Sequence, residues 1–409
     1  MKIVRTLALI ILKTATSILL LAIFAIAITG ISPIYRFKAP EPFGGPDVFN
    51  PYRNLDTLSD WKKANFHTHT RVEGVFNECE FSPMETYQAY EKLGYDIVTF
   101  SNHNKLTTHP FDTNLQVNVY EHGYNLLKYH KLVFGCSKEH WFDHLLPILP
   151  SQRQFQLDYL SKDCDLLQLN HQLRTTLTSK STLEKLNGYQ IMELDSGRST
   201  ENEYWDWALS AGHYSFALAN DDLHYPDRSR NIARRCNFLQ CKSGAYKDIK
   251  KVLSEGCYYS MRIPDYGKGE WEVKYEKNRN LPTISDIGSK GDTIYIRLSA
   301  VADSIKVTGQ NHTKLALETS SDRLSFVMDS QTPYARFTAY FPEGEVIWSN
   351  PFARYDSAVA ETPLSRTPGH TINITLTIIY NMLLLIIAAA AITCIYKLWE
   401  RRQETQKTK

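Results

Sequence analysis

Residues 82–103 read SPMETYQAYEKLGYDIVTFSNH and contain a helix followed directly by a strand. The motif at residues 82–85 combines a capping box with proline at the first helical position, so it predicts a helix that continues to about Leu93. Residues 95–100 (YDIVTF) have the β-branched and aromatic composition of a strand. This strand ends in the polar Ser-Asn-His of residues 101–103. The stretch therefore predicts a helix and a buried strand whose end presents polar side chains.

The same order of helix and strand continues along the chain. Further strands are predicted at residues 131–134, 166–169, 189–192, 215–219, 236–239 and 258–260. Helices are predicted between them at residues 204–211 and 246–253. Alternating strands and helices indicate a parallel α/β sheet or barrel, in which chemistry lies where strands end. Polar and ligand-type residues do follow the apolar runs here.

From about Leu281 the pattern changes to strands without helices. Alternating segments occur at residues 293–300, 314–317, 325–328 and 335–341, and residues 345–351 (EVIWSNP) close the region. This pattern predicts a small antiparallel β-sandwich. It contains no group of metal-ligating residues, so we expect it to serve packing or spacing.

Both ends of the chain contain apolar stretches. Residues 7–31 are almost entirely apolar, with Lys13 as the charged exception, and residues 372–395 contain no charge. Each is long enough to cross a bilayer core, which takes roughly 20 residues. Basic residues precede the first stretch and follow the second, which predicts two membrane spans with both termini cytoplasmic and residues of about 35–370 outside. The first stretch could instead be a signal peptide, but its length favours an uncleaved anchor.

These observations divide the chain into seven predicted segments. They are an N-terminal transmembrane anchor or signal peptide (1–34), a linker (35–60), an α/β body (61–280), a β-sandwich-like domain (281–358), a second linker (359–370), a transmembrane helix (371–396) and a basic cytoplasmic tail (397–409). The formal net charge of +2 gives no indication of nucleic-acid binding. Six of the seven cysteines fall outside the spans, which permits disulfides, with Cys236 and Cys241 as the nearest pair, or free buried thiols.

A possible metal site begins at residues 65–70, which read NFHTHT. In an extended chain, side chains two residues apart point to the same face, so His67 and His69 could bind one ion together. A His-x-His motif occurs often by chance, and the case depends on partners elsewhere. Candidate partners follow later strands: His103, Glu139 with His144, His171, and Asp222 with His224. This mixture of imidazole and carboxylate suits zinc, manganese or iron. The candidate ligands are more numerous than one tetrahedral ion needs, which points to a site with two or three ions.

The ordered set His-Thr-His-Thr, Ser-Asn-His, Gly-x-x-x-Glu, Asn-His and Asp-x-His resembles the polymerase and histidinol phosphatase (PHP) domain. The resemblance covers residues 61–263 and implies a distorted seven-stranded β/α barrel with two or three metal ions that hydrolyses phosphate esters. The fold predicted for the chain is therefore a distorted (β/α)7 barrel, then the β-sandwich, flanked by two transmembrane helices. Residues 347–351 (IWSNP) resemble a C-terminal segment of a PHP branch that includes carbamate hydrolases.

The resemblance implies a set of metal ligands in this chain. They are His67, His69, Glu73, His103, Glu139, His144, His171, Asp222 and His224. Glu139 would bridge two ions, and Glu73 would be a longer-armed ligand where the family more often has Asp. The family usually has Asp where this chain has Asn102, a position at which a carboxylate raises the basicity of a ligand. Gln172 follows His171 where the family often has proline.

Other polar residues near these motifs have alternative interpretations. Arg228 and Arg235 could bind a substrate phosphate or belong to a solvated basic loop. Glu193 is predicted to form a salt bridge, and Asp221 to support the loop rather than bind a metal. Three other histidines of this region, His109, His122 and His130, are predicted to be surface or packing residues.

We predict a membrane-anchored metal-dependent hydrolase, a phosphoesterase that uses a metal-bridged hydroxide at an extracytoplasmic site. Its cofactors would be two or three divalent ions (zinc, manganese or iron). Its partners would be the membrane and a small-molecule or phosphate-ester substrate, with no nucleic acid, and the oligomeric state stays open. Two alternatives remain: a carbamate or amide hydrolase of the same fold, and a non-catalytic metal-binding or scaffolding ectodomain.

Overall fold

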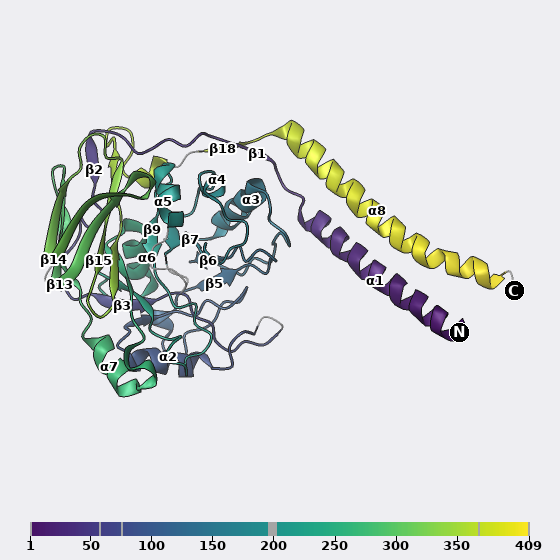
Figure 1. Ribbon diagram of the computed structural model, residues 1–409, viewed down its shortest axis with the longest axis horizontal. Coiled ribbons are helices and arrows are strands. Elements are labelled where there is room, and N and C mark those ends of the chain that lie inside the picture. The colour runs from purple at the N-terminus through teal and green to yellow at the C-terminus, as the bar shows by residue number, and fades with distance from the viewer. Residues whose placement is uncertain (1, 57–58, 75–76, 195–202, 367–368, 408–409) are drawn as a thin grey trace.

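The computed structural model describes residues 2–56, 59–74, 77–194, 203–366 and 369–407. Two long terminal helices extend side by side away from a body of sheets and shorter helices (Figure 1). The chain is mixed α/β, as the sequence predicts. Residues 408–409 of the predicted basic tail lie outside the described residues.

The helices and strands have the following bounds. The helices are α1 (Lys2–Thr29), α2 (Pro83–Lys92), α3 (Pro150–Leu160), α4 (Lys180–Leu183), α5 (Glu203–Ser210), α6 (Tyr246–Glu255), α7 (Trp271–Arg279) and α8 (Ile374–Lys407). The first nine strands are β1 (Tyr35–Phe37), β2 (Asp47–Phe49), β3 (Lys62–Asn65), β4 (Ile97–Val98), β5 (Val119–His122), β6 (Lys131–Phe134), β7 (Leu166–Leu169), β8 (Ile191–Glu193) and β9 (Phe216–Leu218). The others are β10 (Arg235–Leu239), β11 (Tyr258–Arg262), β12 (Ile284–Lys290), β13 (Thr293–Gly309), β14 (Thr313–Val327), β15 (Tyr334–Tyr340), β16 (Val346–Ser349), β17 (Phe352–Tyr355) and β18 (His370–Ile372).

Local chemistry sets the ends of the helices. At the start of α2 the Ser82 hydroxyl accepts a hydrogen bond from the Glu85 amide, and the Glu85 carboxylate accepts one from the Ser82 amide. This is the capping box that the sequence predicts. Helix α6 ends at Gly256, whose φ of +84° favours glycine. A Cβ at Gly256 would also overlap the ring of Phe216, so a larger residue does not fit.

The first of the two larger sheets has the order β5-β6-β7-β8-β9. Strands β7, β8 and β9 are parallel, as alternation with helices predicts. Strand β6 is antiparallel to both of its neighbours, β5 and β7, so it runs against the rest of the sheet. Strand β5, which is fully buried, was not predicted from the sequence.

The second larger sheet has eleven strands and contains the order β12-β13-β15-β16-β11-β10-β3-β4. Strands β3 and β4 are parallel, whereas β10 is antiparallel to β3 and β11 is antiparallel to β10. Strand β16 pairs with β11, so the strands that follow Leu281 continue the sheet of the first part of the body. Strand β2, within the predicted linker 35–60, pairs with β17 of the same sheet.

Two isolated β-bridges join the two larger sheets. One connects Thr68 with Leu223 and the other connects His103 with Glu121. The His69 amide also donates to the Leu223 carbonyl at 2.8 Å. The ends of β3 and β4 are therefore held against β5 and the segment after β9. Apolar side chains fill the space below this junction, among them Phe66, which packs edge-on against Phe134.

Helices α1 and α8 are long and apolar enough to cross a membrane by length and composition. They pack on each other: Lys13 Nζ donates to the Leu398 carbonyl at 2.5 Å, and Trp399 Nε1 donates to Ser17 Oγ at 3.1 Å. Most of their apolar side chains point outward and are exposed. A two-stranded sheet of β1 and β18 joins the ends of the helices that meet the body. We call this pair of helices the terminal hairpin.

All seven cysteines are free thiols. Cys236 and Cys241, the pair nearest in sequence, lie along β10 and just beyond its end. Extended backbone separates successive residues by about 3.3 Å, which places the two too far apart for a disulfide.

Candidate metal centre

Polar side chains from both sheets meet where the bridges join them. His67 and His69 follow β3, and His103 follows β4. From the other sheet, Glu121 lies in β5, and His171 follows β7. Glu193 ends β8, and Asp222 and His224 follow β9. These positions share one edge because β3 and β4 are parallel to each other, as are β7, β8 and β9.

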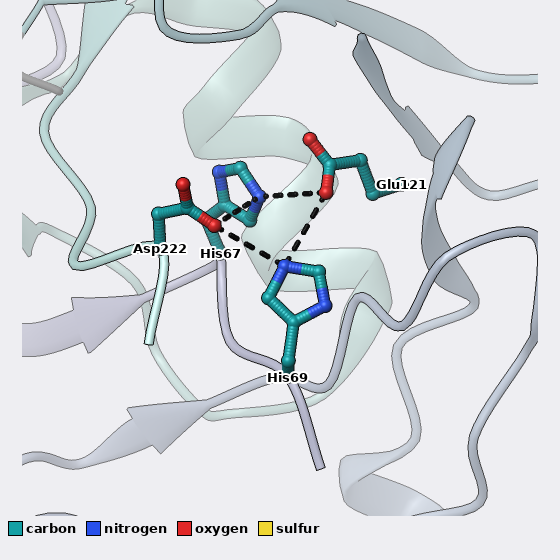
Figure 2. A group of neighbouring side chains, drawn as sticks. All are labelled: His67, His69, Glu121 and Asp222. Atoms are coloured by element: carbon teal, nitrogen blue, oxygen red, sulfur yellow. Dashed lines mark hydrogen bonds and ion pairs between the residues drawn. The ribbon is translucent and has the colours of Figure 1, made fainter. Parts of the chain in front are cut away.

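Glu121 lies at the middle of this group and is almost completely buried. Its Oε2 lies 3.3 Å from Nε2 of His67 and from Nε2 of His69, and 3.1 Å from Nε2 of His103. Figure 2 shows Glu121 and the first two imidazoles pointing toward one another and toward Asp222.

The other oxygen of the same carboxylate faces a second pair of imidazoles. Oε1 of Glu121 lies 3.1 Å from Nδ1 of His130 and 3.1 Å from Nε2 of His171. It also accepts a hydrogen bond from the side-chain amide Nδ2 of Asn170 at 2.9 Å. The two oxygens of Glu121 thus face different sets of nitrogen atoms.

Asp222 completes the part of the cluster drawn in Figure 2. Its Oδ1 lies 3.3 Å from Nε2 of His67 and 3.2 Å from Nε2 of His69. Its Oδ2 accepts a hydrogen bond from the guanidinium of Arg174. The backbone φ of Asp222 is +49°, a conformation that costs energy for a residue other than glycine and is often found at functional sites.

A third carboxylate lies at the outer side of the cluster. Oε2 of Glu78 is 3.2 Å from Nε2 of His103 and 3.0 Å from Nε2 of His224. The side chain of Glu78 is 47% exposed, whereas that of His103 is 9% exposed. This side of the cluster is therefore open to solvent.

Three overlapping groups of these residues could each hold a metal ion, because in each group one ligand atom per residue lies within 4.8 Å of the others. The groups are His67, His69, Glu121 and Asp222; His69, Glu78 and His103; and His103, Glu121 and His130. Each group combines imidazole and carboxylate, the donor set that suits zinc, manganese or iron.

The hydrogen bonds of His67 indicate that the site fits a cation. Nδ1 of His67 lies 2.9 Å from a carboxylate oxygen of Glu193, which favours a proton on that nitrogen and leaves the lone pair on Nε2. Nε2 is buried and makes no hydrogen bond within the described chain, although oxygens of Glu121 and Asp222 lie 3.3 Å away. A cation between these atoms would satisfy them all.

Without an ion, burial and neighbouring charges shift the pKa values of several groups in the cluster. Burial would lower the pKa of His67, but the nearby Asp222 and Glu121 carboxylates outweigh it and raise the pKa well above the ordinary value. Burial would also lower the pKa of His103, but the carboxylates of Glu121 and Glu78 outweigh it and raise the pKa to about 9. Burial would raise the pKa of Glu121, but the surrounding histidines hold it well below its usual range.

Five predicted ligands are outside these three groups among the described residues. Two of them, His171 and His224, still contact the cluster through Glu121 and Glu78. The other three, Glu139, His144 and Glu73, have different surroundings. Glu139 accepts a hydrogen bond from the Leu106 amide at 3.0 Å and lies 3.9 Å from Lys105 Nζ. It follows β6, and because β6 runs against its neighbours, its C-terminal end lies at the opposite edge of the sheet. His144 contacts the Thr29 carbonyl at the end of α1 through Nδ1. Glu73 is exposed.

Sequence reasoning missed three residues of these groups: Glu121, Glu78 and His130. Glu121 could have been found, because residues 117–121 (VNVYE) have a β-branched, aromatic pattern before Gly123. His130 precedes β6, so the reversed direction of that strand brings it to the cluster rather than to the surface. No local pattern identifies Glu78.

The polar residue that precedes His103, Asn102, holds a loop in place rather than supporting a ligand directly. Its Oδ1 accepts from the Thr70 amide at 2.7 Å, and its Nδ2 donates to the hydroxyls of Thr70 and Thr107. An amide can both donate and accept, which these partners require. Asn102 therefore positions the chain immediately after His69.

Several other predicted residues surround the cluster. Asp221 accepts hydrogen bonds from Tyr90 and from backbone amides at the start of β10, so it supports the loop. Glu193 pairs with His67, as described above, and accepts from the His171 amide. His122 is buried and contacts the Phe142 carbonyl at 2.9 Å. His109 packs against Tyr87 and other rings.

A cavity of about 510 Å³ adjoins the cluster and is rich in arginine. Arg235 begins β10 and Arg262 ends β11, and these two residues face each other in the antiparallel pair. Arg174, which contacts Asp222, also lines the cavity and was not predicted. Arg228 is exposed and stacks on the ring of Tyr225 at 3.9 Å. The cavity is also lined by Arg230, Asn231, Arg234, Asp222 and His224.

Comparisons with known proteins give a weak likeness among solved structures. No protein-family model and no curated protein matches the chain. Among solved structures, the chain is similar to a two-domain protein from Bacteroides vulgatus that contains a predicted PHP-like metal-dependent phosphoesterase. The identity is 15%, the match covers 77% of this chain and 99% of the other, and the TM-score is 0.37. A likeness this weak does not establish fold or function.

Proposed function

We propose that this protein is a metal-dependent phosphoesterase with a PHP-type site. The observation that carries the proposal is the buried Glu121 carboxylate, whose two oxygens lie within 3.3 Å of nitrogen atoms from five imidazoles. A carboxylate with each oxygen toward a different set of nitrogens can bridge two ions. The three overlapping ligand groups would accommodate two or three divalent ions of zinc, manganese or iron.

The residues of the chain have distinct tasks in this proposal. The imidazoles and carboxylates hold the ions, and Glu193 orients His67 through its Nδ1. When bound, the ions supply Lewis acidity, which lowers the pKa of water and stabilises charge on a leaving oxygen. Asp222 is held in turn by Arg174, whose guanidinium fixes the second carboxylate oxygen.

The arginine-rich cavity favours a phosphate ester over a carbamate or amide. Guanidinium groups pair well with phosphate oxygens, and a neutral amide would gain little from several arginines. Arg174, Arg235 and Arg262 line this cavity next to Asp222. We infer that they bind the oxygens of the substrate phosphate, while the exposed Arg228 stays outside the contact.

The wider setting of the site is part of the same proposal. The two bridges between the sheets support the distorted barrel that the PHP resemblance implies, with a sandwich-like extension from β12 to β17. The exposed apolar side chains of the terminal hairpin exceed what a water-soluble surface carries, which supports two membrane spans. The basic residues at both ends favour cytoplasmic termini and an extracytoplasmic site.

The decisive experiment compares two glutamates of the full-length, detergent-solubilised protein. Glu121→Gln should remove the bridging charge, reduce the bound metal, and lower aryl phosphate hydrolysis with added manganese or zinc by about 100-fold or more. Glu139→Gln should leave the metal content and the rate within about twofold of the unmodified protein, because a half-buried loop contact outside the ligand groups contributes little to metal binding. Elemental analysis and a colorimetric rate assay measure both quantities.

The proposal is wrong if Glu121→Gln retains both full metal content and full rate. If hydrolysis occurs only with carbamate or amide substrates, the protein is a carbamate or amide hydrolase and not a phosphoesterase. Less than one ion per chain in the unmodified protein, with no hydrolysis, would favour a scaffolding role.

A further inference from the structure

Three loops of the body expose large apolar side chains close to the terminal hairpin. They comprise residues 124–129 (YNLLKY), 144–150 (HLLPILP) and 171–178 (HQLRTTLT). Their side chains Leu126, Ile148, Leu173 and Leu177 are between 41% and 68% exposed. We call these four residues the apolar loop surface. Such exposure is costly in water and usually marks a contact surface.

The three loops are neighbours in space. The Leu126 amide donates to the Leu145 carbonyl at 2.9 Å, and the Thr176 amide donates to the Leu127 carbonyl at 2.8 Å. The buried guanidinium of Arg153 binds carbonyls of the second and third loops together. The loops therefore form one continuous surface that buried hydrogen bonds hold in place.

This surface is continuous with the terminal hairpin. His144, in the second loop, contacts the Thr29 carbonyl at the last residue of α1, and the Leu145 amide lies 3.3 Å from the Thr29 hydroxyl. Gln152, just past this loop, donates to the Tyr380 hydroxyl of α8 at 3.1 Å. The apolar loop surface thus begins where both helices enter the body.

The same loops lead directly to the metal centre. The third loop begins with His171, and its Arg174 amide donates to the His171 carbonyl at 2.7 Å while the Arg174 side chain contacts Asp222. Strand β5, which contains Glu121, runs into the first loop. A contact made by the apolar loop surface would therefore lie beside the cluster and its arginine-rich cavity.

We propose that the apolar loop surface rests on the bilayer that the terminal hairpin crosses, and that the metal centre hydrolyses the phosphate monoester of a lipid headgroup. Water supplies the new oxygen on phosphorus, the P–O bond to the lipid breaks, and the lipid leaves as an alcohol while inorganic phosphate is released. This inference rests on the proposed function for both the membrane spans and the hydrolysis. The continuity with the hairpin favours a bilayer over a second copy of the chain. Exposed Lys128 and Lys180 flank the leucines, an arrangement that suits anionic headgroups.

Fluorescent labels test the bilayer contact independently of catalysis. Single cysteines, Leu126→Cys and Leu177→Cys, are introduced in a Cys394→Ser background, because Cys394 is the exposed native cysteine. A nitrobenzoxadiazole label at either site in vesicle-reconstituted protein should be quenched by doxyl lipids and protected from aqueous iodide. A label at Val327→Cys should show the reverse, because Val327 is the last residue of β14, a strand on the side of the body away from the hairpin (Figure 1). Iodide quenching at all three positions overturns the bilayer contact.

Activity measurements test the lipid substrate. The double variant Leu126→Ser/Leu177→Ser should lose about tenfold or more of its rate on phosphatidate in vesicles, while its rate on a soluble aryl phosphate stays unchanged. The matched control Leu317→Ser/Val327→Ser, which replaces two exposed side chains of β14, should lose neither rate. Equal loss on both substrates, or no loss on vesicles, overturns the proposal. If the unmodified protein hydrolyses neither substrate, the proposed hydrolase function is wrong, and the lipid substrate is wrong with it. The fluorescence measurements still test the bilayer contact, because they do not depend on activity.

Discussion

At the scale of single residues, the cluster is a chain of carboxylates and imidazoles. Glu193 fixes His67, and His67 directs its free nitrogen at Glu121 and Asp222. The sequence predicted a salt bridge for Glu193, and the structure shows what that contact does. By holding Nδ1, Glu193 sets which nitrogen of His67 can bind an ion.

Replacing Glu193 tests this orienting contact. Glu193→Gln should weaken metal binding by about 10–100-fold, because the amide holds the His67 proton less strongly than a carboxylate does. Titration of the metal-free protein with zinc or manganese measures the affinity. Glu184, the half-buried partner of Lys180, lies outside the ligand groups and offers a control: Glu184→Gln should leave the affinity unchanged. Unchanged affinity in Glu193→Gln would show that His67 needs no such support.

At the scale of elements, the direction of one strand decides which residues meet. Strands β6 and β7 have the bounds predicted for residues 131–134 and 166–169. The prediction assumed that each strand ends at the site, and β6 runs the other way. This reversal brings His130 to the cluster and takes Glu139 away from it.

Two histidines near β6 provide a test of that reversal. His130→Ala should reduce metal content and rate, because His130 lies 3.1 Å from Glu121 at the site end of the strand. His140→Ala should change neither, since His140 pairs with Asp163 at 2.9 Å beyond the other end. Elemental analysis and the aryl phosphate assay measure both variants. A stronger effect of His140→Ala would mean that the site lies at the opposite edge.

At the scale of the whole molecule, the cluster lies where the two larger sheets meet. His67, His69 and His103 follow strands of one sheet, whereas Glu121 lies in a strand of the other sheet and Asp222 follows one. Bound ions would therefore link the sheets and stabilise the folded state, because a site that forms only on folding adds its binding energy to stability.

Metal removal should make stability depend on pH in a defined direction. In the metal-free protein, the raised pKa values of His67 and His103 contribute stability that is complete below their ordinary pKa near 6.5. This stability is lost as the pH rises through the raised values, which for His103 is about 9. The lowered pKa values of Glu121 and Asp222 contribute stability that is lost as the pH falls below about 4.

Thermal unfolding of metal-loaded and chelator-treated protein in detergent checks this expectation. Between pH 6.5 and pH 9 the Tm of the treated protein should fall, while that of the loaded protein should not, because metal binding improves as histidines lose their protons. A treated protein whose Tm rises over this range would contradict the assigned proton binding.

The sequence by itself determined the mixed α/β class, the apolar terminal helices, and the strand ends at which histidine and aspartate occur. These are local properties, since hydrophobic period, capping motifs and turn residues act over a few positions. The tertiary structure decided which strand ends share an edge, because the direction of a strand depends on partners far along the chain. For that reason only the folded chain identifies Glu121 in place of Glu139 as the carboxylate between the imidazoles, and His130 as its neighbour.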